Sequence, residues 1–252
     1  MKILSAEKIC KSFASLKVIR NMNFQVDEGT FFTILGPNGC GKTTLLNILV
    51  GLSRPDSGRI ILDGEDITGV ISGKFGYMLQ KDLLLPWRTV YDNMKLITEI
   101  DGSQRYSDSI IKEYLRKVNL LSFEKYYPHQ LSGGMIKRVT LARTLLYCEL
   151  AGANVILMDE PFANLDSITK HYLEADLKKI LKNEGKTIIF VTHDIDEALL
   201  LSDKISILTK RPTKIKETIS LKNSLKKRTK ETLKEKIMEN LRKEVELDET
   251  KK

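Results

Sequence analysis

A stretch of nine residues, GPNGCGKTT (Gly36–Thr44), constrains the fold of this chain more than any other feature. The continuously apolar segment FFTIL precedes it and predicts a buried strand, and TTLLNILVGL continues from it and predicts a buried helix. Gly39 and Gly41 let the backbone curl, so that successive N–H groups point at one anion beside the positive end of the helix. The spacing G-x-x-x-x-G-K-[ST] in this strand–loop–helix setting predicts a site for a nucleoside triphosphate.

Two side chains of this loop have specific expected roles. Lys42 is expected to reach the β- and γ-phosphates, and the hydroxyl group of Thr43 is expected to bind Mg²⁺. Cys40 is interpreted as a small filler rather than a catalytic thiol, because nothing nearby supplies a base for it. The other predicted contacts to the nucleotide come from the rest of the loop, namely Gly36, Pro37, Asn38, Gly39, Cys40, Gly41 and Thr44.

A second polar site is predicted where the apolar segment NVILM ends. Asp159 follows this segment directly, at the carboxyl end of a predicted strand, where α/β sheets bind ligands, and it is expected to hold Mg²⁺. Glu160 comes next and is placed to orient or deprotonate an attacking water, which typically contributes ~10²–10⁴-fold to a rate. The alternative is a pair of solvated carboxylates after a core strand, and the phosphate loop favours the functional interpretation.

His193 ends a further apolar segment, IIFVTH. A histidine at the end of a strand is commonly no more than a polar edge residue. In a doubly wound sheet, however, this strand is expected beside the phosphate loop, so His193 is also a candidate contact to the γ-phosphate. The spacing of the residues that follow does not match a zinc-binding helix.

The chain reads as an α/β core with an insertion. Strand and helix patterns alternate before about residue 82 and again from Asn154, and helical patterns dominate in between. This order predicts a largely parallel sheet with helices on both faces and an inserted helical subdomain over about 82–150. We expect one domain over residues 1–222, followed by a basic helical tail over 223–252.

Charge and cysteine usage exclude several classes of protein. The net charge of +8 belongs mainly to the end of the chain, because 15 of the 41 Lys and Arg, but only 8 of the 33 Asp and Glu, follow residue 208. The nearly neutral remainder argues against a general nucleic-acid-binding face. Three scattered cysteines support neither a disulfide framework nor a zinc site. Without a secretory signal or an apolar run of about 18–20 residues, the chain is expected to be cytosolic.

The order of the motifs resembles that of the ATP-binding cassette (ABC) ATPases over roughly residues 3 to 212. The segment LSGGM resembles the signature motif that distinguishes this family from other phosphate-loop proteins. The resemblance implies a phosphate-loop NTPase core with a mixed sheet, an antiparallel β subdomain and the helical insertion. Six separated elements carry it: Gly36–Thr44, Gln80, Leu131–Met135, Asp159–Glu160, Asn164–Asp166 and His193.

The same resemblance implies a mechanism that needs two copies. They associate head to tail, and each ATP lies between the phosphate loop of one copy and the signature of the other. Ser132, Gly133 and Gly134 are then expected to contact the ATP of the second copy. Asp166 is expected to reach across the dimer, and Gln80 to contact Mg²⁺ or the water.

Phe13 falls where the family usually stacks an aromatic residue on adenine. The alternative for this residue is simple packing within the sheet. Met135 departs from the family, because the signature usually has glutamine there. Methionine offers only packing and a weak acceptor, so we expect a tolerated substitution with weaker dimer closure. Asn164 is unusual for its loop, and LLYCELAGAN (Leu145–Asn154) suggests a longer connection before Asp159 than is usual.

Two segments, LLLPWRTVYDNM (Leu83–Met94) and ILTKRPTKI (Ile207–Ile215), resemble importers for nitrate, alkanesulfonates and taurine. This implies an ATPase subunit at the cytoplasmic face of the membrane, working with permease subunits and indirectly with a substrate-binding protein. Leu85, Pro86 and Trp87 are predicted to form an apolar patch for a coupling helix, the alternative for Trp87 being ordinary helix packing. An exporter-type or lipoprotein-handling system and, less favoured, a nucleic-acid-associated ATPase are the alternatives.

The tail is predicted to be an amphipathic helix, because four apolar residues recur at intervals of four. We favour packing of this helix on the body or on the dimer mate. A basic face on anionic lipid is the other interpretation, which the acidic residues of the tail weaken. The apolar residues are Leu233, Ile237, Leu241 and Val245, and a favourable i,i+4 pair is Glu239–Lys243.

Overall fold

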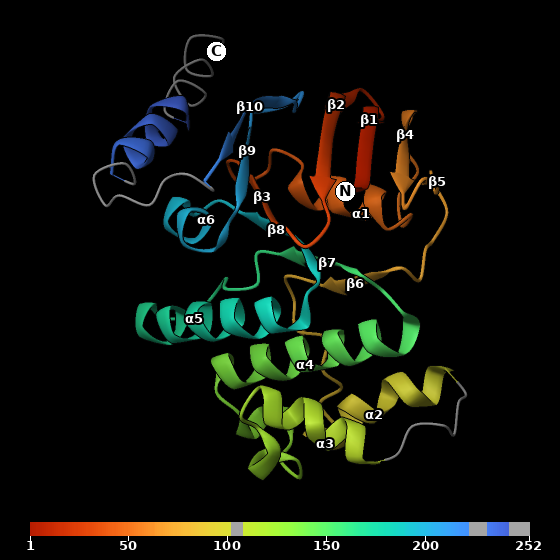
Figure 1. Ribbon diagram of the computed structural model, residues 1–252, viewed down its shortest axis with the longest axis vertical. Coiled ribbons are helices and arrows are strands. Elements are labelled where there is room, and N and C mark those ends of the chain that lie inside the picture. The colour runs from red at the N-terminus through yellow and green to blue at the C-terminus, as the bar shows by residue number, and fades with distance from the viewer. Residues whose placement is uncertain (102–107, 222–230, 242–252) are drawn as a thin grey trace. The chain divides into compact units, whose positions relative to one another are not determined.

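The structure is a computed structural model that describes residues 1–101, 108–221 and 231–241 (Figure 1). The chain divides into two compact units. Unit 1 comprises Met1–Ser72 and Thr187–Lys252, and unit 2 comprises Gly73–Lys186. The helical region predicted over about 82–150 falls within unit 2, whereas the predicted boundary at residues 222–223 lies outside the described residues. None of the helices in the described ranges has the length and apolar character that a bilayer crossing needs.

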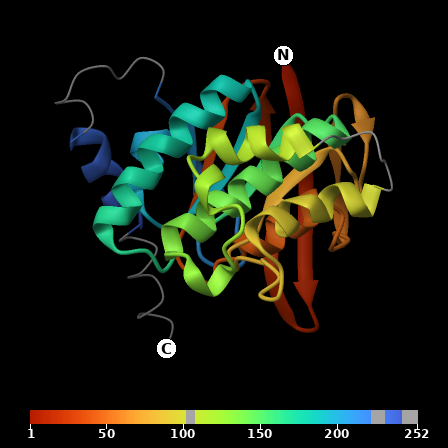
Figure 2. The same cartoon turned by 90° about the horizontal axis from the view of Figure 1, so that it is seen from below.

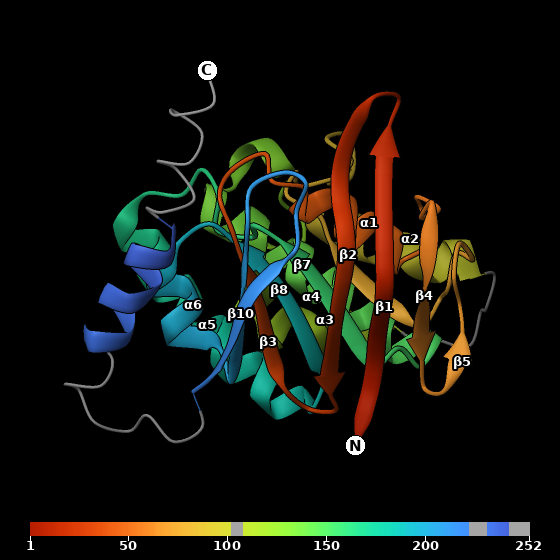
Figure 3. The ribbon, with the colours of Figure 1, turned by 90° about the horizontal axis from the view of Figure 1, so that it is seen from above.

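An antiparallel sheet with the strand order β2-β1-β4-β5 forms one part of unit 1 (Figure 3). In β2, Met22, Phe24 and Val26 are buried, whereas Asn23 and Gln25 between them are exposed. This alternation gives the strand one face for the core and one for solvent. The strands are β1 (Lys2–Phe13), β2 (Leu16–Asp27), β4 (Ser57–Leu62) and β5 (Glu65–Asp66).

The phosphate loop follows the central strand of a second set in unit 1, ordered β10-β9-β3-β8. β3 is buried along its whole length and runs parallel to both β8 and β9, and β10 is antiparallel to β9. Because parallel strands end at the same edge, Leu35 at the end of β3 pairs with Thr192 at the end of β8. This pairing confirms the prediction that the strand before His193 lies beside the strand that leads into the phosphate loop. The elements are β3 (Phe31–Leu35), α1 (Lys42–Leu49), β8 (Thr187–Thr192), α6 (Ile195–Leu201), β9 (Lys204–Leu208) and β10 (Ile215–Ser220).

Unit 2 combines a parallel pair of strands, β6 and β7, with a group of helices. α4 is central in this group, because it contacts α2, α3, α5 and β6 (Figure 2). The elements are β6 (Phe75–Met78), α2 (Val90–Asp101), α3 (Asp108–Lys117), η1 (Leu121–Phe123), η2 (Pro128–Gln130), α4 (Gly133–Ala151), β7 (Val155–Asp159) and α5 (Ser167–Glu184).

Two features of unit 2 differ from what the sequence pattern indicates. The segment LLYCELAGAN is not a long connection, because its first seven residues continue α4 and only residues 152–154 join α4 to β7. Gly152 ends the helix with a φ of 64°, a left-handed cap that glycine adopts without a steric penalty. β6 is a strand that the pattern does not indicate, because Phe75–Met78 is short and contains a glycine.

Residues 231–241 form a helix that packs on the rest of unit 1. Ile237 is fully buried against a cluster from β3, α6 and β9, and Leu233 and Leu241 are partly buried at its edge. Two ion pairs of 2.5 Å join its polar side to the rest of unit 1, Lys234–Asp196 and Lys236–Glu217. The described part of the tail therefore packs on the body of its own chain, one of the arrangements predicted, whereas Lys243 and Val245 lie outside the described residues.

Candidate functional site

The phosphate loop has the curled backbone that its glycines predict. Gly39 and Gly41 have φ values of 73° and 113°, in a region that side chains disfavour. The loop begins where the N–H of Gly36 donates to the carbonyl oxygen of Thr192 at 3.2 Å. A Cβ atom on Gly41 would lie 2.8 Å from Cγ1 of Val18, so only glycine fits there. β8 and β2 therefore hold the loop from two directions.

Lys42 lies against this loop. Lys42 is only 5% exposed, and its Nζ donates hydrogen bonds to the carbonyl oxygens of Gly36 and Pro37 at 3.0 Å each. α1 begins at the same lysine, with Gly41 as its N-cap and without a side chain that caps the first turn. An ammonium group beside the positive end of a helix suits a polyphosphate anion, so the residues present fit ATP.

The other loop residues differ in exposure. Asn38 and Thr43 are exposed, and Thr44 is half-buried. Cys40 is buried, and burial raises the pKa of its thiol, although the charges of Lys42 and Arg211 act in the opposite direction. A protonated, buried thiol agrees with the interpretation of Cys40 as a small filler.

Two further candidate contacts of unit 1 lie at strand ends. Phe13, the last residue of β1, is 51% exposed, and Nζ of Lys11 lies 5.1 Å from the centroid of its ring. The ring is therefore not packed inside the sheet, and part of it is accessible for stacking. His193 follows β8 and is exposed, and Asp194 after it caps α6.

The acidic pair lies at the end of β7 in unit 2. Asp159 is buried, and its negative charge adds to the effect of burial in raising the pKa of Tyr77. Glu160 is half-buried and has a φ of 45°, a left-handed value that costs a residue with a side chain about 1–2 kcal/mol. Strain of this kind concentrates at functional sites, which supports a specific role for Glu160.

Gln80, the signature and the loop after Glu160 line one cavity of about 500 Å³ within unit 2. Gln80 is exposed, and its carbonyl oxygen accepts a hydrogen bond from Nζ of Lys137 at 3.1 Å. The same ammonium group pairs with Asp82 at 3.1 Å. Sequence reasoning missed Lys137, whose only signal is a charged residue on the buried face of α4. The lining also includes Gly133, Ile136, Ala163, Asn164 and Leu165.

The signature residues begin α4. Ser132 is the N-cap, and its hydroxyl oxygen accepts the N–H of Met135 at 3.3 Å. Ser132 and Gly133 are exposed, Met135 is half-buried and Gly134 is buried. A Cβ atom on Gly134 would lie 2.6 Å from Cγ2 of Thr169 in α5. Gly134, a predicted phosphate contact, therefore also lets α4 approach α5, which the sequence does not reveal.

Asp166 is the N-cap of α5. Its carboxylate accepts the N–H of Thr169 at 2.9 Å, and this hydrogen bond holds the pKa of the carboxyl group below its ordinary value. Asp166 is exposed. Asn164, two residues earlier, has a φ of 66°, and asparagine tolerates this region better than most residues. The unusual asparagine of the ANLD loop thus suits the backbone at its position.

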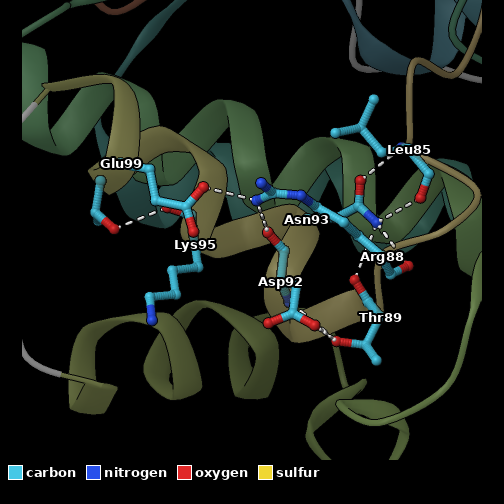
Figure 4. A network of polar contacts seen from close by, with 8 residues as sticks. Leu85, Arg88, Thr89, Asp92, Asn93, Lys95 and Glu99 are labelled. Atoms are coloured by element: carbon cyan, nitrogen blue, oxygen red, sulfur yellow. Dashed lines mark hydrogen bonds and ion pairs between the residues drawn. The ribbon is translucent and has the colours of Figure 1, made fainter.

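A turn held by one buried side chain carries the predicted apolar patch (Figure 4). We call residues 85–89 the Trp87 turn. Asn93 is fully buried, and its Oδ1 accepts the N–H of Leu85 at 2.7 Å. Its amide nitrogen donates to three carbonyl oxygens at 2.9–3.1 Å, those of Leu85, Arg88 and Thr89. Trp87 is 71% exposed and Pro86 is exposed, so ordinary packing does not account for Trp87.

A groove of about 380 Å³ lies between β6, α2 and α4 of unit 2. It adjoins the segment that leads into the Trp87 turn, because Nη1 of Arg143 donates to the carbonyl oxygen of Leu83 at 2.8 Å. Most of its lining is apolar or aromatic: Phe75, Tyr77, Leu96, Ile97, Arg143, Thr144 and Tyr147.

Comparison with known proteins places this site in a family. The model of the ABC transporter family matches residues 19–163. An uncharacterized ABC transporter ATP-binding protein of Methanocaldococcus jannaschii is 43% identical over 88% of this chain and 83% of its own length. The aliphatic sulfonates import ATP-binding protein SsuB of Bacillus cereus is 43% identical over 84% of this chain and 82% of its own length.

A solved structure gives the same result. A dimeric ATP-binding cassette in a post-hydrolysis state, bound to ADP and Pi, matches 88% of this chain and 100% of its own with a TM-score of 0.74 and 29% identity. The predicted fold class, an α/β phosphate-loop core with a mixed sheet and an antiparallel β subdomain, is thereby confirmed. With a phosphate loop, an acidic pair and a signature helix all present, the chain belongs to the ABC transporter family and is an ATP-binding cassette that hydrolyses ATP.

Proposed function

We propose that this chain powers the import of a small molecule or anion through a separate membrane permease. Two copies close on ATP and reopen after hydrolysis. The main support for this proposal is Trp87, which is exposed on a turn that Asn93 restrains. Exposed aromatic side chains on ordered backbone are typical binding residues at protein–protein interfaces. Similarity to the sulfonate importer ATPase of Bacillus cereus supports import and a nitrate-, sulfonate- or taurine-like class of substrate.

Each part of the nucleotide has a proposed partner. Phe13 stacks on adenine, and Lys42 with the loop amides binds the phosphates. The side chains proposed for Mg²⁺, those of Thr43, Asp159 and Gln80, are the hard oxygen donors that this ion prefers. When bound, Mg²⁺ neutralises the charge that develops on the phosphate oxygens.

Glu160 and His193 act on the γ-phosphate. The carboxylate of Glu160 orients the attacking water and takes its proton as the bond to phosphorus forms. His193 contacts the γ-phosphate from the end of β8, the strand that pairs with β3. ADP and phosphate are the products.

Ser132, Gly133, Gly134 and Asp166 serve the ATP of the second copy. The first two are exposed at the start of α4, where the helix offers N–H groups and positive potential to an anion. The similarity to a solved dimeric cassette supports such a pair. Each copy then needs the other for a complete site.

The permease docks at the groove beside the Trp87 turn. Its mostly apolar lining with one arginine fits an amphipathic helix laid into a groove. Arg143 of that lining bonds the carbonyl oxygen of Leu83, four residues before Trp87. The chain accordingly works at the cytoplasmic face of the membrane, held there by the permease. A substrate-binding protein acts on the far side and touches this chain only indirectly.

Affinity purification from detergent-solubilised membranes tests the proposal. The tagged chain is expected to recover a multispan membrane protein, and Trp87→Ala is expected to lower that recovery about tenfold or more, as the loss of an aromatic anchor does. Tyr172→Ala is the matched control, because Tyr172 is also an exposed aromatic residue, 67% exposed, but lies on α5. Equal recovery with all three chains, or no membrane protein at all, contradicts the proposal.

A further inference from the structure

The loop between β9 and β10, residues 209–214, contacts the phosphate loop. Its central anchor is Thr213, which is 1% exposed. The backbone of Thr213 is bonded to β2 on both sides: its N–H donates to the carbonyl oxygen of Val18 at 2.8 Å, and its carbonyl oxygen accepts the N–H of Arg20 at 2.9 Å. These two hydrogen bonds fix the main chain from which the hydroxyl group of Thr213 projects.

This hydroxyl group is directed toward the phosphate loop. Oγ1 of Thr213 donates a hydrogen bond to the carbonyl oxygen of Cys40. The next residue is Gly41, whose φ of 113° lies in a region that glycine adopts readily and other residues do not. Because the peptide unit is planar and trans, fixing the carbonyl of Cys40 also fixes the direction of the Gly41 N–H on the other side of that unit. Thr213 therefore sets the orientation of an amide at the point where the loop meets α1.

Arg211 brings a positive charge to the same place. It is exposed, and Nη2 lies 3.8 Å from the position of a Cβ atom on Gly39. Lys42 approaches the loop carbonyls as the residue that begins α1, and Arg211 lies on the separate loop from β9. An exposed guanidinium group at the edge of a phosphate-binding loop suits a polyphosphate, since its planar fork of N–H donors matches phosphate oxygens.

We propose that residues 209–214 are part of the nucleotide site, with Thr213 positioning the backbone of the phosphate loop and Arg211 binding the polyphosphate of ATP. The proposal concerns the binding of ATP by one chain and does not depend on import or on a permease. It adds a nucleotide-binding element that is contributed by a segment about 170 residues away from the phosphate loop in the sequence.

Nucleotide binding to the isolated, full-length chain tests it, measured by calorimetric titration with ATP, ADP and adenosine without Mg²⁺. Thr213→Val keeps the shape but removes the donor, and it is expected to weaken ATP and ADP about 5-fold, the effect of one hydrogen bond. Adenosine is expected to bind as before, because it has no phosphates. Thr213→Ser restores the donor and is expected to restore the affinity for ATP.

Arg211→Ala is expected to weaken ATP about 2- to 5-fold at low salt and less at high salt, as for other exposed charge contacts. Lys214→Ala is the matched control, because Lys214 is an exposed cation of the same loop and its substitution removes the same charge. Equal affinities for the Arg211 and Lys214 variants overturn the role of Arg211. A folded Thr213→Val chain with wild-type affinity for ATP, or with an equal loss for adenosine, overturns the role of Thr213. If that variant does not fold, the Arg211 and Lys214 pair decides whether the loop belongs to the site.

Discussion

The carboxylate of Glu160 can be tested separately from the left-handed backbone conformation of this residue. Glutamine has the same length as glutamate, so Glu160→Gln keeps the left-handed φ of 45° and changes only the carboxylate. We expect turnover to fall about 10²-fold or more, because the proposed base is lost, and an ATP-bound dimer to accumulate. Size-exclusion chromatography with analysis of the retained nucleotide measures both effects.

Glu149→Gln is the control for this change, because Glu149 is an exposed glutamate on α4. It is expected to hydrolyse ATP at the wild-type rate and to elute without trapped nucleotide. Turnover by the Glu160 variant at the wild-type rate would show that another group activates the water.

Residues that act through their type and spacing could be predicted, and residues that act through distant carbonyl groups could not. Lys42, Asp159 and Glu160 stand in motifs that can be read along the chain. Lys137 bonds the carbonyl of a residue 57 positions away, and Thr213 bonds one 173 positions away. Nothing in the local sequence specifies such pairs, because the fold alone brings them together.

At the scale of elements, the Trp87 turn depends on Asn93. Asn93→Asp keeps the size of the side chain but removes the nitrogen that bonds three carbonyl groups. Two of these carbonyl groups keep a backbone hydrogen bond, that of Leu85 from the N–H of Arg88 and that of Thr89 from the N–H of residue 93. Each hydrogen bond that is lost contributes about 0.5–1.5 kcal/mol, so we expect the turn to loosen while ATP turnover by the isolated chain is retained. Trp87 is the only tryptophan of the chain, so its fluorescence anisotropy reports on the turn directly.

A substitution at the surface near the same turn is the control for Asn93→Asp. Glu99→Gln breaks the 2.7 Å ion pair with Arg88, which is partly exposed and contributes about 0.2–1 kcal/mol. It is expected to leave the anisotropy of Trp87 unchanged. A wild-type anisotropy in Asn93→Asp would mean that the hydrogen bonds of Asn93 do not restrain the turn.

Elements with an unbroken apolar sequence were predictable, whereas those that depend on a close approach were not. β3, β7 and β8 are buried along their whole length, as their sequences indicate. β6 contains Gly76, where a Cβ atom would lie 2.4 Å from Sγ of Cys148. This glycine weakens the strand pattern in the sequence, yet it is what allows α4 to pack against β6.

At the scale of the whole molecule, the described tail helix contributes to the core of unit 1. Ile237→Ala opens a cavity beside a cluster that includes Leu35, the residue before the phosphate loop. We expect the free energy of unfolding to fall by about 2–5 kcal/mol, seen as a lower urea midpoint. ATP is expected to raise that midpoint in both chains, because it binds only the folded state.

Lys236→Ala tests the polar side of the same helix. It removes the ion pair with Glu217, whose partners are both at least one-third exposed, and is expected to change the stability by less than about 1 kcal/mol. Equal midpoints for Ile237→Ala and the wild type would mean that this helix does not stabilise unit 1. The sequence predicted an apolar face for the tail helix. It did not predict which surface this face packs against, because amphipathicity specifies the face of a helix and not its partner.

α4 has a mechanical consequence. The helix has 19 residues, so it is about 28 Å long, and three residues separate its end from β7. Ser132 caps its first turn, and Asp159 ends β7. A stiff rod with a connection this short cannot take up displacement at one end without passing it to the other. In the proposed pair, the first turn of α4 contacts the second copy's ATP, and β7 leads to the residues that contact the chain's own ATP. Movement at one of these two sites is therefore coupled to movement at the other, which disfavours independent hydrolysis cycles.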